Sequence, residues 1–285
     1  MSARVVVLIG AARGIGAATA RRLAARGDAL VLADADAPAL EAVRAELARG
    51  GARVIAQVTD VRDVAALTRL RDHARVAFGR VDTLVNFAAI IRPADLTELS
   101  PGAVADQIQV NLVGAIHATQ VFLPAFLEAR RGHVIHVASL GGIVPLPHET
   151  VYSASKFGLR GFCHALALEL RGTGVKVTVV SPDSVDTQQL ALEAAHAPST
   201  LAFTSAALPA DAVARAIARA LDRPRLEVLV PGARGVLIKL LAFSPRLFWL
   251  LYPLLDRLGR YGQAAYHRKG ARPRAGRAVP QEARS

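Results

Sequence analysis

Short apolar runs alternate with helical patterns along most of the chain. The runs are rich in Val, Ile and Leu, as in strands buried on both faces, and they cover residues 4–9, 29–33, 52–57, 83–86, 133–138, 175–180 and 226–230. Between them, apolar residues recur at helical spacing, for example over 38–49, 63–78 and 209–222. This alternation predicts a parallel, doubly wound α/β sheet, and no repeat or linker divides the chain before about residue 231.

The first apolar run leads directly into a glycine-rich turn. Gly10, Gly14 and Gly16 lie between this strand and the helical pattern that starts at Ala17. Glycines let a backbone approach a pyrophosphate, and the free N–H groups of a helix N-terminus attract its charge. The next strand ends at Asp34, where a carboxylate can accept hydrogen bonds from adenosine ribose hydroxyls. Together these features predict a dinucleotide-binding turn.

Further polar residues follow the next strands. Asp60 comes just after the third strand, where ligands lie in open parallel sheets, but it is equally placed to cap the next helix. Asn86 ends the fourth strand. Asn111 lies inside a long amphipathic helical pattern, where asparagine is mildly unfavourable, so we expect its side chain to have a partner.

The segment from Ser139 to Lys156 carries the candidate chemistry. Tyr152 and Lys156 are four residues apart in a helical pattern, so both side chains are predicted to project from one helix face. A fixed positive charge favours a phenolate, which makes the tyrosine usable for proton transfer. Ser139, at the end of an apolar run, can bring a hydroxyl to the same place. Residues 140–151 contain Gly and Pro and predict a loop that forms one wall of the pocket.

These features occur in an order that resembles the short-chain dehydrogenase/reductase family over roughly residues 4–231. The matching motifs are Gly10-x-x-x-Gly14-x-Gly16, Asp34, Asp60-Val61, Asn86, Asn111, Ser139, Tyr152-x-x-x-Lys156 and Pro182-x-x-Val185-x-Thr187. The resemblance implies a single Rossmann domain with a parallel seven-stranded sheet. It also implies an NAD(P)-dependent oxidoreductase that interconverts a secondary alcohol and a ketone by direct hydride transfer.

The resemblance also implies the roles of four catalytic residues. Tyr152 is expected to donate a proton in ketone reduction and to accept one in alcohol oxidation, while Ser139 orients the substrate oxygen. Lys156 is expected to lower the pKa of the tyrosine and to hold the nicotinamide ribose, and Asn111 to anchor a water that links Lys156 to solvent. The implied cofactor contacts are Gly10, Arg13, Gly14, Ile15, Gly16, Asp34, Asp60, Val61, Asn86, Ala88, Tyr152, Lys156, Pro182, Val185 and Thr187. No metal site is expected.

Asp34 predicts NAD(H) rather than NADP(H), because a carboxylate repels a 2′-phosphate at short range. Arg13 favours the opposite choice, since family members that use NADP can carry a basic residue in this loop. The alternative to an active enzyme is a nucleotide-binding regulatory or scaffolding relative that kept the fold and lost turnover.

The chain departs from the family pattern near the cofactor. Ile9 stands where the family usually has Thr, and Asp183 where it usually has Gly. Phe87 and Ala89 replace the usual Asn and Gly after Asn86. The four catalytic residues are nevertheless all present, which favours an active enzyme.

The family's variable loop corresponds to residues 188–208, where the helical pattern weakens. This weakening predicts a mobile segment or a lid at the rim of the sheet. Its apolar side chains favour a lipophilic substrate, such as a steroid, a retinoid-like molecule or a long-chain alcohol, but they are equally suited to packing the loop onto the domain. The apolar residues are Leu190, Leu192, Leu201 and Phe203, and the main polar exceptions are Glu193 and His196.

Charge and cysteine content bear on the partners and the cellular compartment of the protein. The net charge is +12, and residues 256–285, with eight basic and two acidic residues, carry half of it. We expect residues 259–285 to be a disordered, solvated tail. We expect no nucleic-acid partner, because no DNA- or RNA-binding motif accompanies the positive charge. The single cysteine, Cys163, fits a reducing compartment. Neither a signal peptide nor a convincing membrane-spanning stretch is apparent, so we expect a cytoplasmic protein.

An apolar and aromatic extension follows the predicted domain at residues 232–258. Trp249, Tyr252 and the neighbouring arginines suit a segment that lies at a membrane surface, through residues 236–260. A lid over the substrate pocket and a subunit interface are the two alternatives. The family resemblance implies a homodimer or homotetramer, paired through the helices that carry Asn111 and Tyr152.

Overall fold

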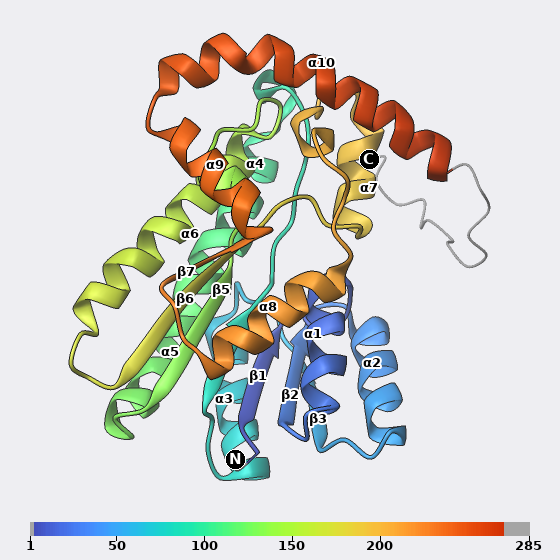
Figure 1. Cartoon of the computed structure of the whole chain (residues 1–285). Helices are drawn as coiled ribbons and strands as arrows, with labels where there is room; N and C mark the ends of the chain where they lie inside the picture. Colours follow the sequence, from blue (N-terminus) through green and yellow to red (C-terminus); the bar gives the residue numbers. More distant parts are fainter. Residues whose placement is uncertain (1–2, 271–285) are drawn as a thin grey trace.

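The computed structural model describes residues 3–270 and contains a seven-stranded, all-parallel sheet (Figure 1). The strand order is β3-β2-β1-β4-β5-β6-β7. The strands are β1 (Val5–Ile9), β2 (Ala29–Asp34), β3 (Val54–Val58), β4 (Thr83–Asn86), β5 (Gly132–Val137), β6 (Val175–Pro182) and β7 (Glu227–Val230). The predicted doubly wound sheet is confirmed.

Helices cover both faces of the sheet (Figure 1). They are α1 (Gly14–Ala24), α2 (Ala37–Arg49), α3 (Val64–Phe78), α4 (Pro101–Ile108), α5 (Gly114–Glu128), α6 (Thr150–Glu169), α7 (Gln188–Ala195), α8 (Ala210–Asp222), α9 (Gly232–Ala242) and α10 (Pro245–Gly270). Helices α1, α2 and α8 pack on one face, and α3, α5 and α6 on the other. Because helices cover both faces of each central strand, the strand is apolar on both sides rather than alternating between apolar and polar residues.

The strand order reverses between β1 and its neighbour β4. Ile9 at the end of β1 is in register with Ala33 of β2 on one side and with Asn86 of β4 on the other. In open α/β sheets, ligands bind in the crevice outside the carboxyl ends of the strands at such a reversal. The glycine-rich turn after β1 therefore lies at the expected ligand crevice.

The helical pattern around Asn111 is interrupted. Gln109–Val113 forms a π-helical segment between α4 and α5, and Asn111 within it is fully buried. Within the part of the chain that the structure describes, the stretch Pro101–Glu128 is the one helix long and apolar enough to cross a membrane. Its Phe122 and Phe126 are buried in the core against the sheet, so this stretch is a core helix of the domain.

The C-terminal extension is helical beyond its predicted end. Helix α10 runs to Gly270, so the expectation of a disordered tail is wrong for residues 259–270, and residues 271–285 lie outside the described residues. Together α9 and α10 form an arch above the carboxyl ends of the strands, and α10 passes over α7 (Figure 1). The arch belongs to the side of the domain that carries the ligand crevice.

Helix α10 packs closely on the segment that follows α7. A Cβ at Gly259 would lie 2.2 Å from the carbonyl oxygen of Thr200, and one at Gly262 would lie 1.9 Å from that of Phe203. The Thr200 hydroxyl also donates to the Asp256 carboxylate at 2.7 Å. These contacts explain why α10 continues past residue 258. Its two glycines let the helix backbone pack against residues 200–203, where larger residues would clash.

Candidate active site

The turn between β1 and α1 has a geometry that requires glycine. Gly10 has a φ of +80°, and a Cβ there would lie 2.7 Å from the backbone nitrogen of Ala88. A Cβ at Gly16 would lie 2.0 Å from the Gly10 carbonyl oxygen. Gly14 has a φ of +50° and faces the side chain of Thr187. The turn presents bare backbone and a helix N-terminus to the crevice, which suits a pyrophosphate.

Asp34 lies beside this turn at the end of β2. Its Oδ2 accepts a hydrogen bond from the backbone of Ala12 at 3.0 Å, and its Oδ1 accepts one from the backbone of Asp36 at 3.0 Å. Arg13 forms an ion pair with Asp36, and this guanidinium lowers the pKa of the Asp36 carboxyl. Sequence reasoning missed Asp36, whose carboxylate holds Arg13 next to the crevice.

Asp60 and Val61 follow β3, whose end pairs with β2 at Asp34. Asp60 accepts hydrogen bonds from the backbone and guanidinium of Arg62, and these bonds lower the pKa of its carboxyl. The cap of α3 is Asp63, which accepts from the backbone of Ala65, so the alternative of Asp60 as that cap is wrong. Val61 is buried and lines the cavity.

Asn86 shapes the loop after β4 rather than the cavity wall. Its side chain is buried, and its Oδ1 accepts a hydrogen bond from the backbone of Ala88 at 3.1 Å. This bond fixes the strand end against Gly10, while Phe87 and Ala89 line the cavity. Among the described residues, Arg130 and His148 alone combine a side chain with a positive φ, so Ala89 sits in the loop without strain.

The departure at Asp183 has a clear structural consequence. The carboxylate accepts hydrogen bonds from Arg234 of α9 and from the Ser205 hydroxyl. Asp183 and Arg234 are 11% and 32% exposed, so the ion pair is partly shielded from water. The residue that replaces the family's glycine therefore connects the end of β6 to the C-terminal extension.

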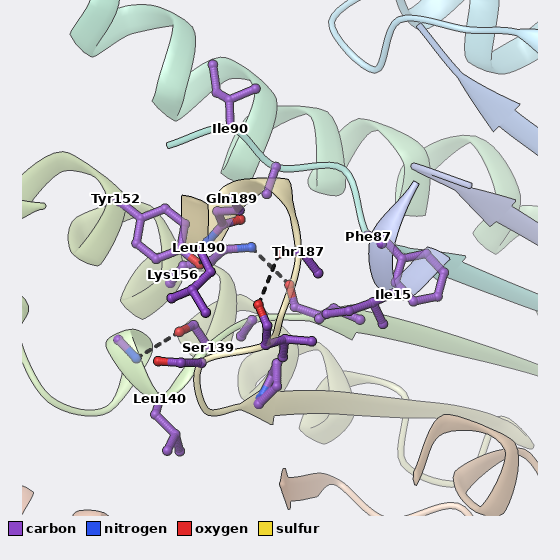
Figure 2. A pocket seen from close by; sticks show the side chains of 18 of the residues that line it. Ile15, Phe87, Ile90, Ser139, Leu140, Tyr152, Lys156, Thr187, Gln189 and Leu190 are labelled. Carbon is purple, nitrogen blue, oxygen red and sulfur yellow. Dashed lines mark hydrogen bonds between the residues drawn. The ribbon is translucent and has the colours of Figure 1, made fainter. Parts of the chain in front are cut away.

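Three of the four residues with implied catalytic roles, Ser139, Tyr152 and Lys156, come together at the end of β5 and the start of α6. The Lys156 ammonium donates to the carbonyl oxygen of Val137 at 3.0 Å and lies 5.6 Å from the centre of the Tyr152 ring. The Ser139 hydroxyl accepts from the backbone of Gly141 at 3.0 Å. Figure 2 shows Tyr152, Lys156 and Ser139 around one pocket.

Asn111 lies behind this group and binds backbone. Its side chain accepts from the nitrogen of Ile90 at 2.8 Å and donates to the carbonyl oxygen of Ile90 at 2.9 Å. It also donates to the Ser155 hydroxyl at 3.1 Å. The partner expected for this buried asparagine is therefore the loop after β4, which it ties to α6.

Burial dominates the electrostatics of the pair on α6. It lowers the pKa of Lys156 to about 8. The pKa of Tyr152 is raised by burial first and by the charge of Glu193 second, while hydrogen bonds from Gln189 and Ser139 work in the opposite direction. The net shift in the pKa of Tyr152 is therefore upward, and the role of Lys156 in lowering this pKa stays a prediction.

A cavity of about 730 Å³ contains most of the predicted site residues. From the predicted set, the following residues line it: Gly10, Arg13, Gly14, Ile15, Gly16, Asp34, Asp60, Val61, Ala88, Ser139, Tyr152, Lys156, Pro182, Val185 and Thr187. Asn86 and Asn111 lie behind its wall, where they hold the loop after β4.

The substrate end of the cavity is mainly apolar and is formed by segments far apart in sequence. Three segments contribute apolar side chains: the loop at 140–151, the variable loop and the extension. These side chains are Leu140, Val144, Leu146, Leu190, Leu201, Leu237, Ile238, Leu241, Phe248 and Leu255. Leu192 is instead 51% exposed, and Phe203 packs in a small core with Tyr266. Sequence reasoning missed the side chains from α9 and α10, because contacts between distant segments leave no local pattern.

Helix α7 adds two polar groups to this apolar end. Figure 2 shows Gln189 beside Tyr152. The Gln189 amide nitrogen lies 3.3 Å from the Tyr152 hydroxyl and 3.1 Å from Oε1 of Glu193. Glu193 was recognisable from the sequence only as a polar exception in the loop. Gln189 carried no signal, since a single glutamine on a short helix is unremarkable.

Comparison with known proteins agrees with the site. A family model described as short chain dehydrogenase matches residues 4–197. An uncharacterized oxidoreductase of Staphylococcus aureus is 34% identical over 222 residues, which cover 78% of this chain and 92% of that protein. The matched region includes the glycine turn and the Tyr152–Lys156 pair.

Two solved structures share the fold and hold dinucleotides. A short-chain dehydrogenase/reductase from Burkholderia phymatum in complex with NAD is 31% identical, has a TM-score of 0.78, and aligns over 83% of this chain and 92% of that one. A metagenomic short-chain oxidoreductase in complex with NADP is 32% identical, has a TM-score of 0.68, and aligns over 79% and 95%. The bare glycine turn beside Asp34 fits the pyrophosphate and ribose of such a cofactor. The chain therefore belongs to the short-chain dehydrogenase/reductase family and is an oxidoreductase that uses NAD or NADP.

Proposed function

We propose that this protein interconverts a lipophilic secondary alcohol and its ketone with NAD(H), using Tyr152 as the general acid and base. The observation that carries the proposal is the meeting of Tyr152, Lys156 and Ser139 in one cavity with the glycine turn. A bound nicotinamide dinucleotide supplies or accepts the hydride. The protein's own residues then have to position the substrate oxygen and move one proton.

Each of the four residues has a role suited to its surroundings. Tyr152 gives its proton to the substrate oxygen in reduction and takes it back in oxidation, and Ser139 orients that oxygen. Lys156, whose pKa burial lowers to about 8, is able to exchange a proton near neutral pH and so to resupply the phenol. Asn111 holds the loop at Ile90, and we assign it the family's role of anchoring a water that links Lys156 to solvent.

The direct test is Tyr152→Phe, which removes one hydroxyl from a buried ring. We expect it to reduce turnover by at least about a hundredfold, the range of general acid–base catalysis, while NADH still binds in a nicotinamide-fluorescence titration. Full turnover in this variant would disprove the mechanism. Tight NADH binding with no turnover in wild type on any alcohol or ketone would instead favour the alternative, a regulatory or scaffolding relative.

The NAD preference rests on the two acids near the ribose position. Asp34 presents its carboxylate beside the glycine turn, and Asp36 engages Arg13, the one cation in that turn. A 2′-phosphate would meet negative charge at close range. We therefore expect a higher kcat/KM with NAD than with NADP; equal or better efficiency with NADP would overturn this assignment.

The lipophilic substrate is supported by the wall of the cavity. Leu190 and Leu201 come from the variable loop, and Leu237, Leu241 and Phe248 come from the extension. An apolar substrate would displace water from these side chains. We expect kcat/KM to rise with hydrophobicity across a graded panel of secondary alcohols and ketones. A preference for the small polar members would refute this part of the proposal.

The family is typically oligomeric, and we propose a homodimer or homotetramer formed through α5 and α6. These helices leave Leu127, Phe157 and Leu168 at 39%, 40% and 67% exposed, which is suited to a partner subunit. Light scattering on the full chain should give two or four subunits. Replacing Phe157 and Leu168 by Ser should shift the mass toward a monomer, and an unchanged mass would place the interface elsewhere.

We further propose a cytoplasmic protein that contacts anionic membranes through the outer side of the arch. Phe243, Trp249 and Leu250 are exposed there, and the exposed charges of α10 up to Arg268 are arginines, since its one acid, Asp256, is bound to Thr200 and Arg260. Apolar side chains flanked by cations suit a headgroup layer. We place no nucleic acid among the expected partners.

Vesicle co-sedimentation tests this contact with the full-length chain. We expect pelleting with anionic vesicles that weakens at high salt and is reduced at least about tenfold by Trp249→Ser with Leu250→Ser. Val76→Ser, an 87% exposed position on α3, is the matched control and should pellet like wild type. If the full chain does not pellet, the arch serves only as cover for the cavity.

A further inference from the structure

Helix α7 brings to Tyr152 two polar side chains that the roles above leave unused. The Gln189 amide nitrogen carries two hydrogens; one is directed at the Tyr152 hydroxyl and the other at Oε1 of Glu193, at 3.3 and 3.1 Å. Gln189 and Glu193 are four residues apart on one helix face, and both line the cavity. A continuous hydrogen-bonded chain thus runs from a carboxyl group through an amide to the phenol.

We infer that Gln189 and Glu193 are positioning residues for Tyr152: the Gln189 amide orients the phenolic hydroxyl, and the Glu193 carboxyl group fixes that amide. The inference rests on the proposed acid–base role of Tyr152. A phenol oxygen that accepts a bond from Gln189 keeps its own hydrogen for the substrate oxygen. The variable loop, which covers the substrate, then also sets how readily the tyrosine gives or takes a proton.

The Glu193 carboxyl group is buried next to a second buried carboxyl group, that of Glu149. Glu193 is 6% exposed and Glu149, the residue that precedes α6, is 3% exposed. Within residues 3–270, neither carboxyl forms an ion pair with a basic side chain, and Oε2 of Glu149 has no hydrogen-bond partner. Burial and mutual repulsion raise the pKa of Glu149, and burial raises the pKa of Glu193. A buried pair of this kind favours retaining a proton.

The amide and the carboxylate affect Tyr152 in opposite directions. The hydrogen bond from Gln189 lowers the pKa of Tyr152, because it stabilises the phenolate. A negative charge on Glu193 raises the pKa of Tyr152, because it repels the phenolate. Glu149 acts in the same direction as Glu193 but less strongly. This opposition gives the inference a signature that a purely structural role for α7 lacks.

Other titratable groups lie on the elements near α7, and Tyr266 of α10 packs directly against it. They are Lys156 on α6, His148 with Asp95 in the preceding loops, His196 with Ser199 after α7, and Asp256 and His267 on α10. His267 and Gln263 of α10 bind the carbonyl oxygen of Ala194. The C-terminal helix thereby holds α7 in the position that brings Gln189 to the phenol.

The pH dependence of kcat/KM for alcohol oxidation tests the inference. In Glu193→Gln the hydrogen bonds through the Gln189 amide persist but the negative charge is gone. The limb of the pH profile that reflects ionisation of Tyr152 should therefore move to lower pH by roughly one unit. In Gln189→Met the phenolate loses a donor, so the same limb should move to higher pH by a similar amount and kcat should fall roughly tenfold. Glu149→Gln should produce a smaller shift in the direction of Glu193→Gln.

The control is Leu192→Ala, an exposed position on the outer side of α7, which should leave both the limb and kcat unchanged. Limbs that stay fixed in both test variants, or that move in the same direction, would overturn the inference. Phenolate absorbance at a fixed alkaline pH, corrected with Tyr152→Phe, gives a second measurement without substrate. It should be higher in Glu193→Gln than in wild type. Because it needs no turnover, a failed acid–base role and a failed positioning role are distinguishable.

Discussion

The cofactor half and the substrate half of the cavity are held in different ways. In the cofactor half, the turns after β1, β2 and β4 are fixed by contacts made to backbone, such as the approach of Gly10 to Ala88 and the hydrogen bond that the Ala12 N–H donates to the Asp34 carboxylate. In the substrate half, α7, α9 and α10 are fixed by side chains from distant segments, such as Arg234 on Asp183. The first half follows from the sheet, while the second depends on the extension.

The two halves also differ in buried ionisable groups. The sheet that supports the cavity contains His133 and His136 on β5, which burial keeps neutral and whose pKa values it lowers to about 4 and about 3. The substrate half contains Glu149 and Glu193, whose pKa values are raised. A buried base and a buried acid respond to pH in opposite ways, so pH should separate the two halves.

The largest expected effect is the loss of global stability in acid. A base with a lowered folded-state pKa contributes stability above its ordinary pKa of 6.5, and the contribution is lost as pH falls toward the folded value. Each histidine should cost about 2 kcal/mol of unfolding free energy between pH 7 and pH 5. Urea unfolding at both pH values measures it.

The double variant His133→Gln/His136→Gln gives the control for this prediction. Both imidazoles use Nε2 to bond a threonine hydroxyl, His133 to Thr178 and His136 to Thr119, and a glutamine amide can replace that bond. We expect the double variant to lose much less stability between pH 7 and pH 5. A loss as steep as in wild type would show that other groups cause it.

The substrate half should respond in the opposite direction. A carboxyl whose folded-state pKa is raised contributes stability below its ordinary pKa, and this contribution is lost as pH rises through the raised value. Hydrogen exchange, corrected for its intrinsic pH dependence, should therefore show residues 188–203 opening more often at pH 9 than at pH 6, while β1 stays protected. The variant Glu149→Gln/Glu193→Gln should remove this trend.

The next effect separates backbone geometry from close packing in the cofactor half. Gly10→Ala combines a positive φ with a Cβ 2.7 Å from Ala88, and should lower the unfolding free energy by about 3 kcal/mol and abolish NADH binding. Gly27→Ala has a φ of +81° but nothing within 4 Å, and should cost only about 1 kcal/mol. Equal losses of unfolding free energy in the two variants would mean that the close contact with Ala88 adds nothing to the cost of Gly10→Ala.

This difference between the halves explains what sequence reasoning could reach. Gly10, Asp34 and the Tyr152–Lys156 pair belong to short segments whose spacing fixes their geometry, so fold class and cavity position were predictable. Apart from β4, the predicted strand boundaries differ from those of the structure by one or two residues, as strand ends without caps usually do. None of these errors moved a site residue.

The substrate half was less predictable because its contacts join distant parts of the chain. The helical end of α10 depends on Gly259 and Gly262 meeting the turn at residues 201–203, which no local pattern encodes. The raised pKa of Tyr152 depends on burial and on Glu193, neither of which the four-residue spacing to Lys156 reveals. Only the three-dimensional arrangement shows that the Tyr152 ring is buried and that Glu193 lies close to it.

The smallest expected effect tests whether the two halves are independent. Asp183→Gly restores the family's usual residue and, among the described residues, leaves Arg234 hydrogen-bonded to the Thr204 hydroxyl. Because Arg234 is 32% exposed, we expect a cost of only about 1 kcal/mol in unfolding free energy. The KM for substrate should rise roughly threefold to tenfold as α9 loosens, a binding loss of similar size.

The dissociation constant for NADH should stay unchanged in Asp183→Gly, because the glycine turn and Asp34 do not depend on α9. Asp211→Ala is the matched control, since it breaks ion pairs with Arg22 and Arg215 away from the extension and should leave the KM for substrate as in wild type. A weaker NADH affinity with an unchanged KM would contradict the division into two halves. It would mean that Asp183 shapes the cofactor site, and that the extension covers the cavity without holding its wall.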